Sequence, residues 1–167
     1  LTLLVALVML IGVPVVYSRV GAPVEFFPDV EPDTGVVLVH ARGNISLAEG
    51  DYALALEYFK ESLQHGQKIG DISGTTVMLS NIGNTYYRMG DFDLSLEYHK
   101  KALTLKERFG QKWGIAASNL AIGVIHFARG ELEQAKERYD RSHEIWEKMG
   151  DKGGLVPTLN NIGELHL

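Results

Sequence analysis

The sequence matches itself at a shift of 40 residues, and this repeat constrains the fold more than any other feature. A glycine followed by an acidic residue recurs at three equivalent places, Gly50-Asp51, Gly90-Asp91 and Gly130-Glu131. Three isoleucine-glycine pairs coincide at the same shift, Ile82-Gly83, Ile122-Gly123 and Ile162-Gly163. A unit of this length cannot bury its apolar side alone, so the repeat predicts an array of stacked units.

Each unit contains two segments of helical length, such as residues 75–89 and 92–109. Glycine readily ends a helix in the left-handed conformation, and an acidic residue after it can cap the next helix. Small residues recur where two helices would approach closely, including a glycine in the middle of the first helix at Gly83, Gly123 and Gly163. Glycine there costs roughly 1 kcal/mol relative to alanine, so we expect close helix packing at all three.

This pattern of small and large residues resembles the tetratricopeptide repeat, in the 40-residue form of the kinesin light chains and LGN-type adaptors. The most typical copy is LSNIGNTYYRMGDFDLSLEYHKKAL, from Leu79 to Leu103, and the resemblance covers Gly50 to Leu167. It implies an all-α solenoid, a right-handed superhelix of helix-turn-helix units over residues 44–167. It also implies a groove, lined by the first helix of each unit, that holds an extended peptide or a protein partner.

The resemblance assigns residues to this groove, and they are Ser80, Asn81, Asn84, Tyr87, Arg88, Leu120, Val124, Phe127, Asn160, Asn161 and Glu164. The string NIGN, Asn81 to Asn84, matches the asparagine ladder of the LGN-like proteins. An asparagine amide both donates and accepts hydrogen bonds, which suits a peptide backbone. The alternative is that these asparagines are merely solvated. Chaperone C-termini are not predicted as ligands, because that pattern needs groove lysines that the sequence lacks.

The N-terminal part of the sequence has a different residue pattern from the repeats. Residues 1–18 carry no charge and as a helix would extend roughly 27 Å, so they predict a transmembrane helix, with a signal-peptide core or a buried helix as alternatives. Residues 19–43 predict an extended linker, because three prolines interrupt it and the β-branched run from Gly35 to Ala41 favours a short strand.

The segment 1–49 resembles a piece of an RND efflux transporter, chiefly through EFFPDVEPDTGVVLVHARGNIS, Glu25 to Ser46. The membrane helices that relay protons in that family have no counterpart here, so the resemblance implies an origin and not a transport activity. Such a segment would face the periplasm, whereas long tetratricopeptide arrays are mostly cytoplasmic. A gene fusion or an artefactual join explains the conflict. If residues 1–18 span a membrane, the chain is membrane-associated, and the sequence does not determine on which side of the membrane the array lies.

Composition and spacing exclude several kinds of site. The net charge of −5 argues against nucleic acid, and the lack of cysteine removes thiol chemistry. His126 and His166 would lie roughly 10 Å apart, too far to share a zinc ion. We therefore predict no cofactor, no metal and no enzyme, but a non-catalytic interaction scaffold. An efflux-transporter fragment and a sensor module of a larger signalling protein are the alternatives. Self-association is expected through the apolar side of the last helix.

Overall fold

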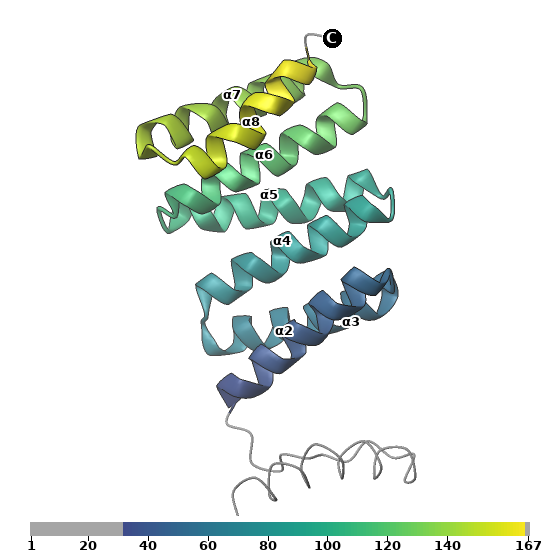
Figure 1. Ribbon diagram of the computed structural model, residues 1–167. Helices are drawn as coiled ribbons and strands as arrows, with labels where there is room; N and C mark the ends of the chain where they lie inside the picture. Colours follow the sequence, from purple (N-terminus) through teal and green to yellow (C-terminus); the bar gives the residue numbers. More distant parts are fainter. Residues whose placement is uncertain (1–31, 166–167) are drawn as a thin grey trace, which may run out of the picture. The chain divides into compact units, whose positions relative to one another are not determined.

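The computed structural model describes residues 32–165, and side chains from residue 39 onward. This part of the chain is helical throughout, with no strand (Figure 1). Its helices are α2 (Pro32–Glu49), α3 (Tyr52–Ile69), α4 (Ile72–Arg88), α5 (Phe92–Arg108), α6 (Lys112–Ala128), α7 (Leu132–Met149) and α8 (Lys152–Glu164). Each helix from α3 onward packs against the next in the chain, and α6 also touches α8. The prediction of a repeat solenoid is confirmed.

The turns follow the repeated glycine-acid pairs. The six turn glycines, 20 residues apart from Gly50 to Gly150, all have φ between 65° and 83°, which glycine adopts without strain. Four aspartates cap the following helix, with a carboxylate that accepts a hydrogen bond from the amide three residues on: Asp51, Asp71, Asp91 and Asp151. Gln111 and Glu131 stand at the remaining two starts and make no such bond. The predicted helix-turn-helix unit is therefore present.

Mid-helix glycines let aromatic rings lie between helices. A Cβ added to Gly43 would come within 2.5 Å of Phe59, and one added to Gly123 within 2.5 Å of Tyr139. Gly83 faces His99 in the same way. The close packing predicted at Gly83 and Gly123 is thus confirmed. At Gly163 the prediction is wrong, because no described residue lies within 4 Å of its added Cβ.

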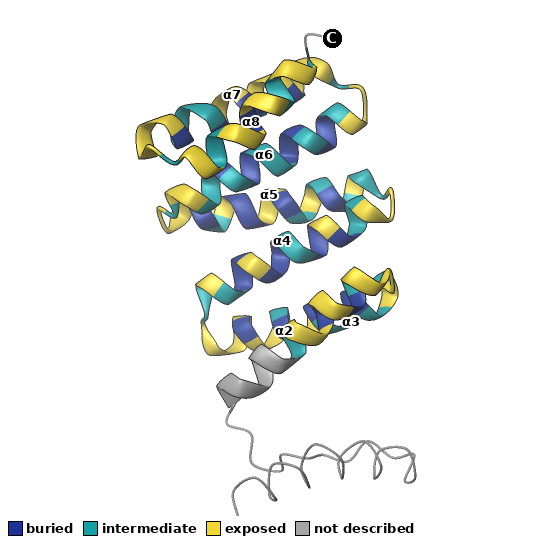
Figure 2. Ribbon diagram, viewed as in Figure 1, coloured by how far each residue is buried: buried dark blue, intermediate teal, exposed yellow. Residues whose placement is uncertain are grey.

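The core runs along the helix interfaces, with Phe59, Ile82, Ile122 and Ala135 all fully buried (Figure 2). The outer face of α8 is different. Val156 and Leu159 are 59% and 50% exposed, although the equivalent residues of α6, Ala116 and Asn119, are buried. The last described helix therefore presents an apolar surface, as the sequence predicted.

The strand predicted from Gly35 to Ala41 is wrong, because α2 is helical from Pro32 to Glu49. Proline is tolerated in the first turn of a helix, and the β-propensity of a short valine-rich run yields to packing. The packing here is that of Gly43 and His40 on Phe59. The structure thus gives no support to the transporter-like strand in this segment.

The predicted transmembrane helix, residues 1–18, lies outside the described residues. Among residues 32–165, no helix is both long and apolar enough to cross a bilayer. Residues 34–165 belong to one compact unit.

Candidate functional site

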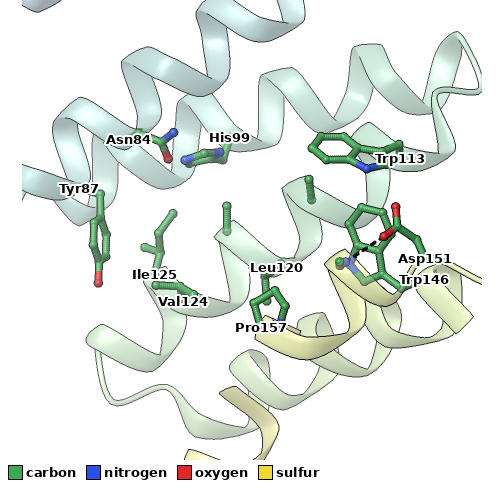
Figure 3. A pocket seen from close by; sticks show the side chains of 14 residues that line it. Asn84, Tyr87, His99, Trp113, Leu120, Val124, Ile125, Trp146, Asp151 and Pro157 are labelled. Atoms are coloured by element: carbon green, nitrogen blue, oxygen red, sulfur yellow. Dashed lines mark hydrogen bonds between the residues drawn. The ribbon is translucent and has the colours of Figure 1, made fainter. Parts of the chain in front are cut away.

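Two cavities adjoin each other along α4, α6 and α8. The first has a volume of about 560 Å³ and reaches from Tyr87 on α4 to Pro157 on α8 (Figure 3). The second, about 550 Å³, lies between α4 and α6. Five residues line both cavities: Asn84, His99, Trp113, Ala117 and Ala121. The two cavities therefore form one continuous depression, which we call the groove.

Part of the predicted set lines this groove. Ser80 and Asn81 line the second cavity, Asn84 lines both, and Tyr87, Leu120 and Val124 line the first. The other predicted residues line neither cavity, and they are Arg88, Phe127, Asn160, Asn161 and Glu164. The structure thus brings together the central predicted residues on α4 and α6, and leaves those near the helix ends and on α8 apart from them.

The two asparagines of the NIGN string differ in what their amides contact. The Nδ2 of Asn81 lies 3.2 Å from the Nε2 of His40, which links α4 to α2. Asn84 is exposed, and its amide makes no hydrogen bond within residues 39–165. Since an amide can both donate and accept, Asn84 offers a peptide backbone two hydrogen bonds at the junction of the two cavities.

Lys106 is a groove residue that the sequence prediction missed. Its side chain comes from α5, lines the second cavity and is only 8% exposed. The ammonium donates to Ser80 Oγ and to Ser118 Oγ, at 2.9 Å each. Burial lowers the pKa of Lys106 from its ordinary value. The sequence does distinguish this position, because the 40-residue shift aligns Lys106 with Gly66 and Trp146. A charged residue thus occurs where the other two units have uncharged ones.

His99 lies beside Asn84 and lines both cavities (Figure 3). Burial, and to a smaller extent the charge of Lys106, lowers the pKa of His99 to about 4. The imidazole is therefore neutral near pH 7. Its Nδ1 is buried without a hydrogen-bond partner among the described residues. A polar atom left in this way is unusual, because burying one without a partner costs free energy.

The end of the groove near α8 is apolar. Trp113 is 61% exposed, and its ring packs edge-on against Trp146 with centroids 5.5 Å apart. Leu120, Val124 and Pro157 complete this wall (Figure 3). Asp151 also lines the first cavity, but its carboxylate already caps α8 through the amide of Gly154. This end suits an apolar side chain.

The histidines and acidic residues of the described part of the chain do not gather into a metal site. Residues 39–165 contain no group of three or more side chains that could hold a metal ion. His126 contacts Glu131, with 2.5 Å between Nδ1 and Oε2, while His166 lies outside the described residues. What the groove does offer is amide, hydroxyl and ammonium donors beside an apolar wall.

In comparison with known families, the family model described as tetratricopeptide repeat matches residues 33–108. No curated protein is significantly similar in sequence. Among solved structures, the chain is similar to BtubC (BKLC) from P. vanneervenii, at 15% identity and a TM-score of 0.74. This match covers 85% of the chain and 59% of BtubC, so the chain spans little more than half of that protein.

Two further similar structures hold peptides. The first TPR of Spaghetti (RPAP3), bound to the HSP90 peptide SRMEEVD, matches at 17% identity and a TM-score of 0.62, over 83% of this chain and 95% of that one. The Rap conjugation gene regulator of the plasmid pLS20, in complex with the Phr* peptide, matches at 16% identity and a TM-score of 0.70. This match covers 87% of this chain and 42% of the regulator. At these identities the matches establish the fold alone.

Proposed function

The chain is a tetratricopeptide-repeat protein, and from that premise we propose that it is a non-catalytic scaffold that binds an extended peptide segment of a partner protein in its groove. The observation that carries the proposal is the position of Asn84. This exposed amide without a described partner stands where the two cavities meet.

The groove chemistry supports a peptide as the ligand. An extended peptide exposes amide and carbonyl groups at regular intervals, and side chains alternate between its two sides. The amides of Asn81 and Asn84 lie on one helix, three residues apart and so on neighbouring positions of one face. The wall of Trp113, Leu120 and Pro157 offers contact to apolar side chains. Two structures of the same fold, as described above, contain bound peptides, which supports the same ligand class.

The experiment is a selection from a random twelve-residue peptide library, displayed on phage, against the complete chain. Enriched peptides are then synthesised and their dissociation constants measured by fluorescence anisotropy. We expect Asn84→Ala to weaken binding about tenfold, because the substitution removes one or two hydrogen bonds to the peptide. Ala121→Arg should abolish binding, because Ala121 lines both cavities and the larger side chain would fill the groove.

The matched control is Gln134→Ala, an exposed polar residue of α7 that lines neither cavity. This variant should bind like the unmodified chain. Failure to enrich any peptide would contradict the proposal. So would an enriched peptide whose affinity is unchanged by both Asn84→Ala and Ala121→Arg while their circular dichroism stays native, since binding would then take place elsewhere.

A further inference from the structure

The groove contains a buried positive charge that no described carboxylate neutralises. Lys106 is 8% exposed, and within the described part of the chain its ammonium is hydrogen-bonded only to two uncharged serine hydroxyls. Within residues 39–165 it has no carboxylate within ion-pair distance, whereas the exposed lysines 101, 136 and 148 each have one. Other described lysines without a carboxylate partner, such as Lys60 and Lys100, are exposed to solvent, so Lys106 is the one lysine of residues 39–165 that is both buried and without such a partner.

Such an arrangement is costly for the free protein. Moving an ammonium out of water costs several kcal/mol unless charged or polar groups compensate it. Two serines satisfy two of its three N–H donors, which leaves one donor and the whole charge for another group. Since Lys106 lines the second cavity, that group can come from a molecule in the groove.

The surroundings of Lys106 favour an anion over a cation or a neutral group. The second cavity is lined by donors and by apolar side chains, and no aspartate or glutamate is among its lining residues. Asn84, Gln111 and the hydroxyl of Ser118 can donate to a carboxylate as well, whereas the hydroxyl of Ser80 already donates to the carbonyl of Thr76. Neighbouring His99, whose buried Nδ1 has no hydrogen-bond partner among residues 39–165, is a further polar group in the same wall.

The position of Lys106 within the groove indicates an internal residue of the peptide. On one side of Ser80, to which the Lys106 ammonium donates, the second cavity is lined along α4 as far as Ser73. On the other side the first cavity continues to Pro157 on α8. Since the depression extends both ways, a chain in the groove passes Lys106 and does not end there.

We propose that Lys106 forms a subsite for an aspartate or glutamate side chain within the bound peptide, with an apolar residue of the same peptide against Trp113 and Leu120. This inference rests on the proposed function. The subsite is confined to one unit of the described array, because the equivalent positions in α3 and α7 are Gly66 and Trp146. The partner is thus an acidic segment with a nearby apolar side chain.

The test is a double-mutant cycle with the peptides enriched on the complete chain. Each is synthesised with a blocked C-terminus, once with its acidic residues and once with the matching amides. On the unmodified chain we expect the acid-to-amide change to weaken binding about tenfold, because this is the loss of affinity expected when one hydrogen bond to a charged group is removed. On Lys106→Met the same change should have an effect near unity, and Lys106→Arg should restore part of the preference.

Lys101→Met is the matched control, because it removes one lysine charge from an exposed site of the same helix that pairs with Glu97. It should retain the full acid preference. The inference is overturned, while the proposed function stands, if peptides bind the groove but acid and amide forms bind equally, or if Lys106→Met keeps the preference. It is equally overturned if only a free C-terminal carboxylate improves binding. If no peptide binds at all, the proposed function itself fails.

Discussion

The ring of His99 lies directly against Gly83, so that a Cβ at Gly83 would be 2.7 Å from the ring Cδ2 and 2.8 Å from Nε2. Real Cβ atoms do not approach other atoms this closely. Phe59 over Gly43 and Tyr139 over Gly123 repeat the arrangement in the neighbouring units. An aromatic ring of one helix on a glycine of the preceding helix therefore holds each unit together, and at His99 the same contact forms part of the groove wall.

Gly83→Ala should destabilise the fold by about 1–2 kcal/mol. Overpacking destabilises by roughly 1–3 kcal/mol, and the higher helix propensity of alanine offsets up to about 1 kcal/mol of this loss. Gly163→Ala is the matched control, since among residues 39–165 nothing lies within 4 Å of its added Cβ. It should leave stability unchanged or raise it by up to about 1 kcal/mol. Urea unfolding followed by circular dichroism measures both. Equal effects of the two substitutions would show that Gly83 is not tightly packed.

His99→Phe should make the fold less sensitive to acid. The pKa of His99 is about 4 in the folded chain, lowered from 6.5, so the unfolded chain binds the proton more readily. The stability contributed by the neutral ring is full above pH 6.5 and is lost as the pH falls toward 4, by about 3 kcal/mol. Phenylalanine fits, since Phe59 occupies the equivalent position.

The measurement is urea unfolding of both proteins at pH 7 and at pH 4. The difference in unfolding free energy between the two proteins should widen at the lower pH in favour of the phenylalanine variant. Parallel loss of stability in both proteins would mean that His99 takes up a proton freely in the folded chain.

Lys106→Met should leave thermal stability unchanged or raise it, because apolar replacement of a buried charge often stabilises a fold. Ser118→Ala should instead lower the unfolding free energy by about 1–2 kcal/mol, since it removes one acceptor from the buried ammonium. Differential scanning calorimetry of both variants separates the two outcomes. A loss of more than about 2 kcal/mol in Lys106→Met would indicate that the lysine is required for folding and not for binding.

Self-association through α8 is testable by sedimentation velocity. Val156 and Leu159 present apolar side chains to solvent at 59% and 50% exposure. We expect the complete chain to form dimers or larger species as its concentration rises, and the double variant Val156→Ser/Leu159→Ser to remain monomeric over the same range. Identical concentration dependence in both proteins would assign any association to another surface.

The repeat made the fold of the array predictable. Equivalent glycines mark the helix ends, since a left-handed turn needs them, and the spacing of small and large residues marks the packed faces. The segment from Gly35 to Ala41 was predicted wrongly because β-branched residues carry only a weak preference. Its fold is decided by contacts distant in sequence, such as that of Gly43 with Phe59.

The candidate site was only partly predictable. The first helix of each unit was expected to line the groove, which holds for Asn84 and Leu120. Lys106 was missed because it belongs to a second helix, and only the three-dimensional packing shows that its stem crosses Gly114 to reach the cavity. A residue on a helix assigned to packing was not considered as a ligand contact. Asn160 and Glu164 were predicted because they occupy the repeat positions of Leu120 and Val124. In the structure α8 lines the groove through Pro157 and not through these two residues.

Mapping of a bound peptide by nuclear magnetic resonance tests the central claim most directly. Proton–nitrogen correlation spectra of the labelled complete chain are recorded as an enriched peptide is added. The account predicts that the largest amide shifts fall on α4 and α6 around Asn84, Ala117 and Ala121, which line both cavities. Shifts confined to exposed residues of α3, α5 and α7, such as Glu57, Glu97 and Lys136, would contradict it.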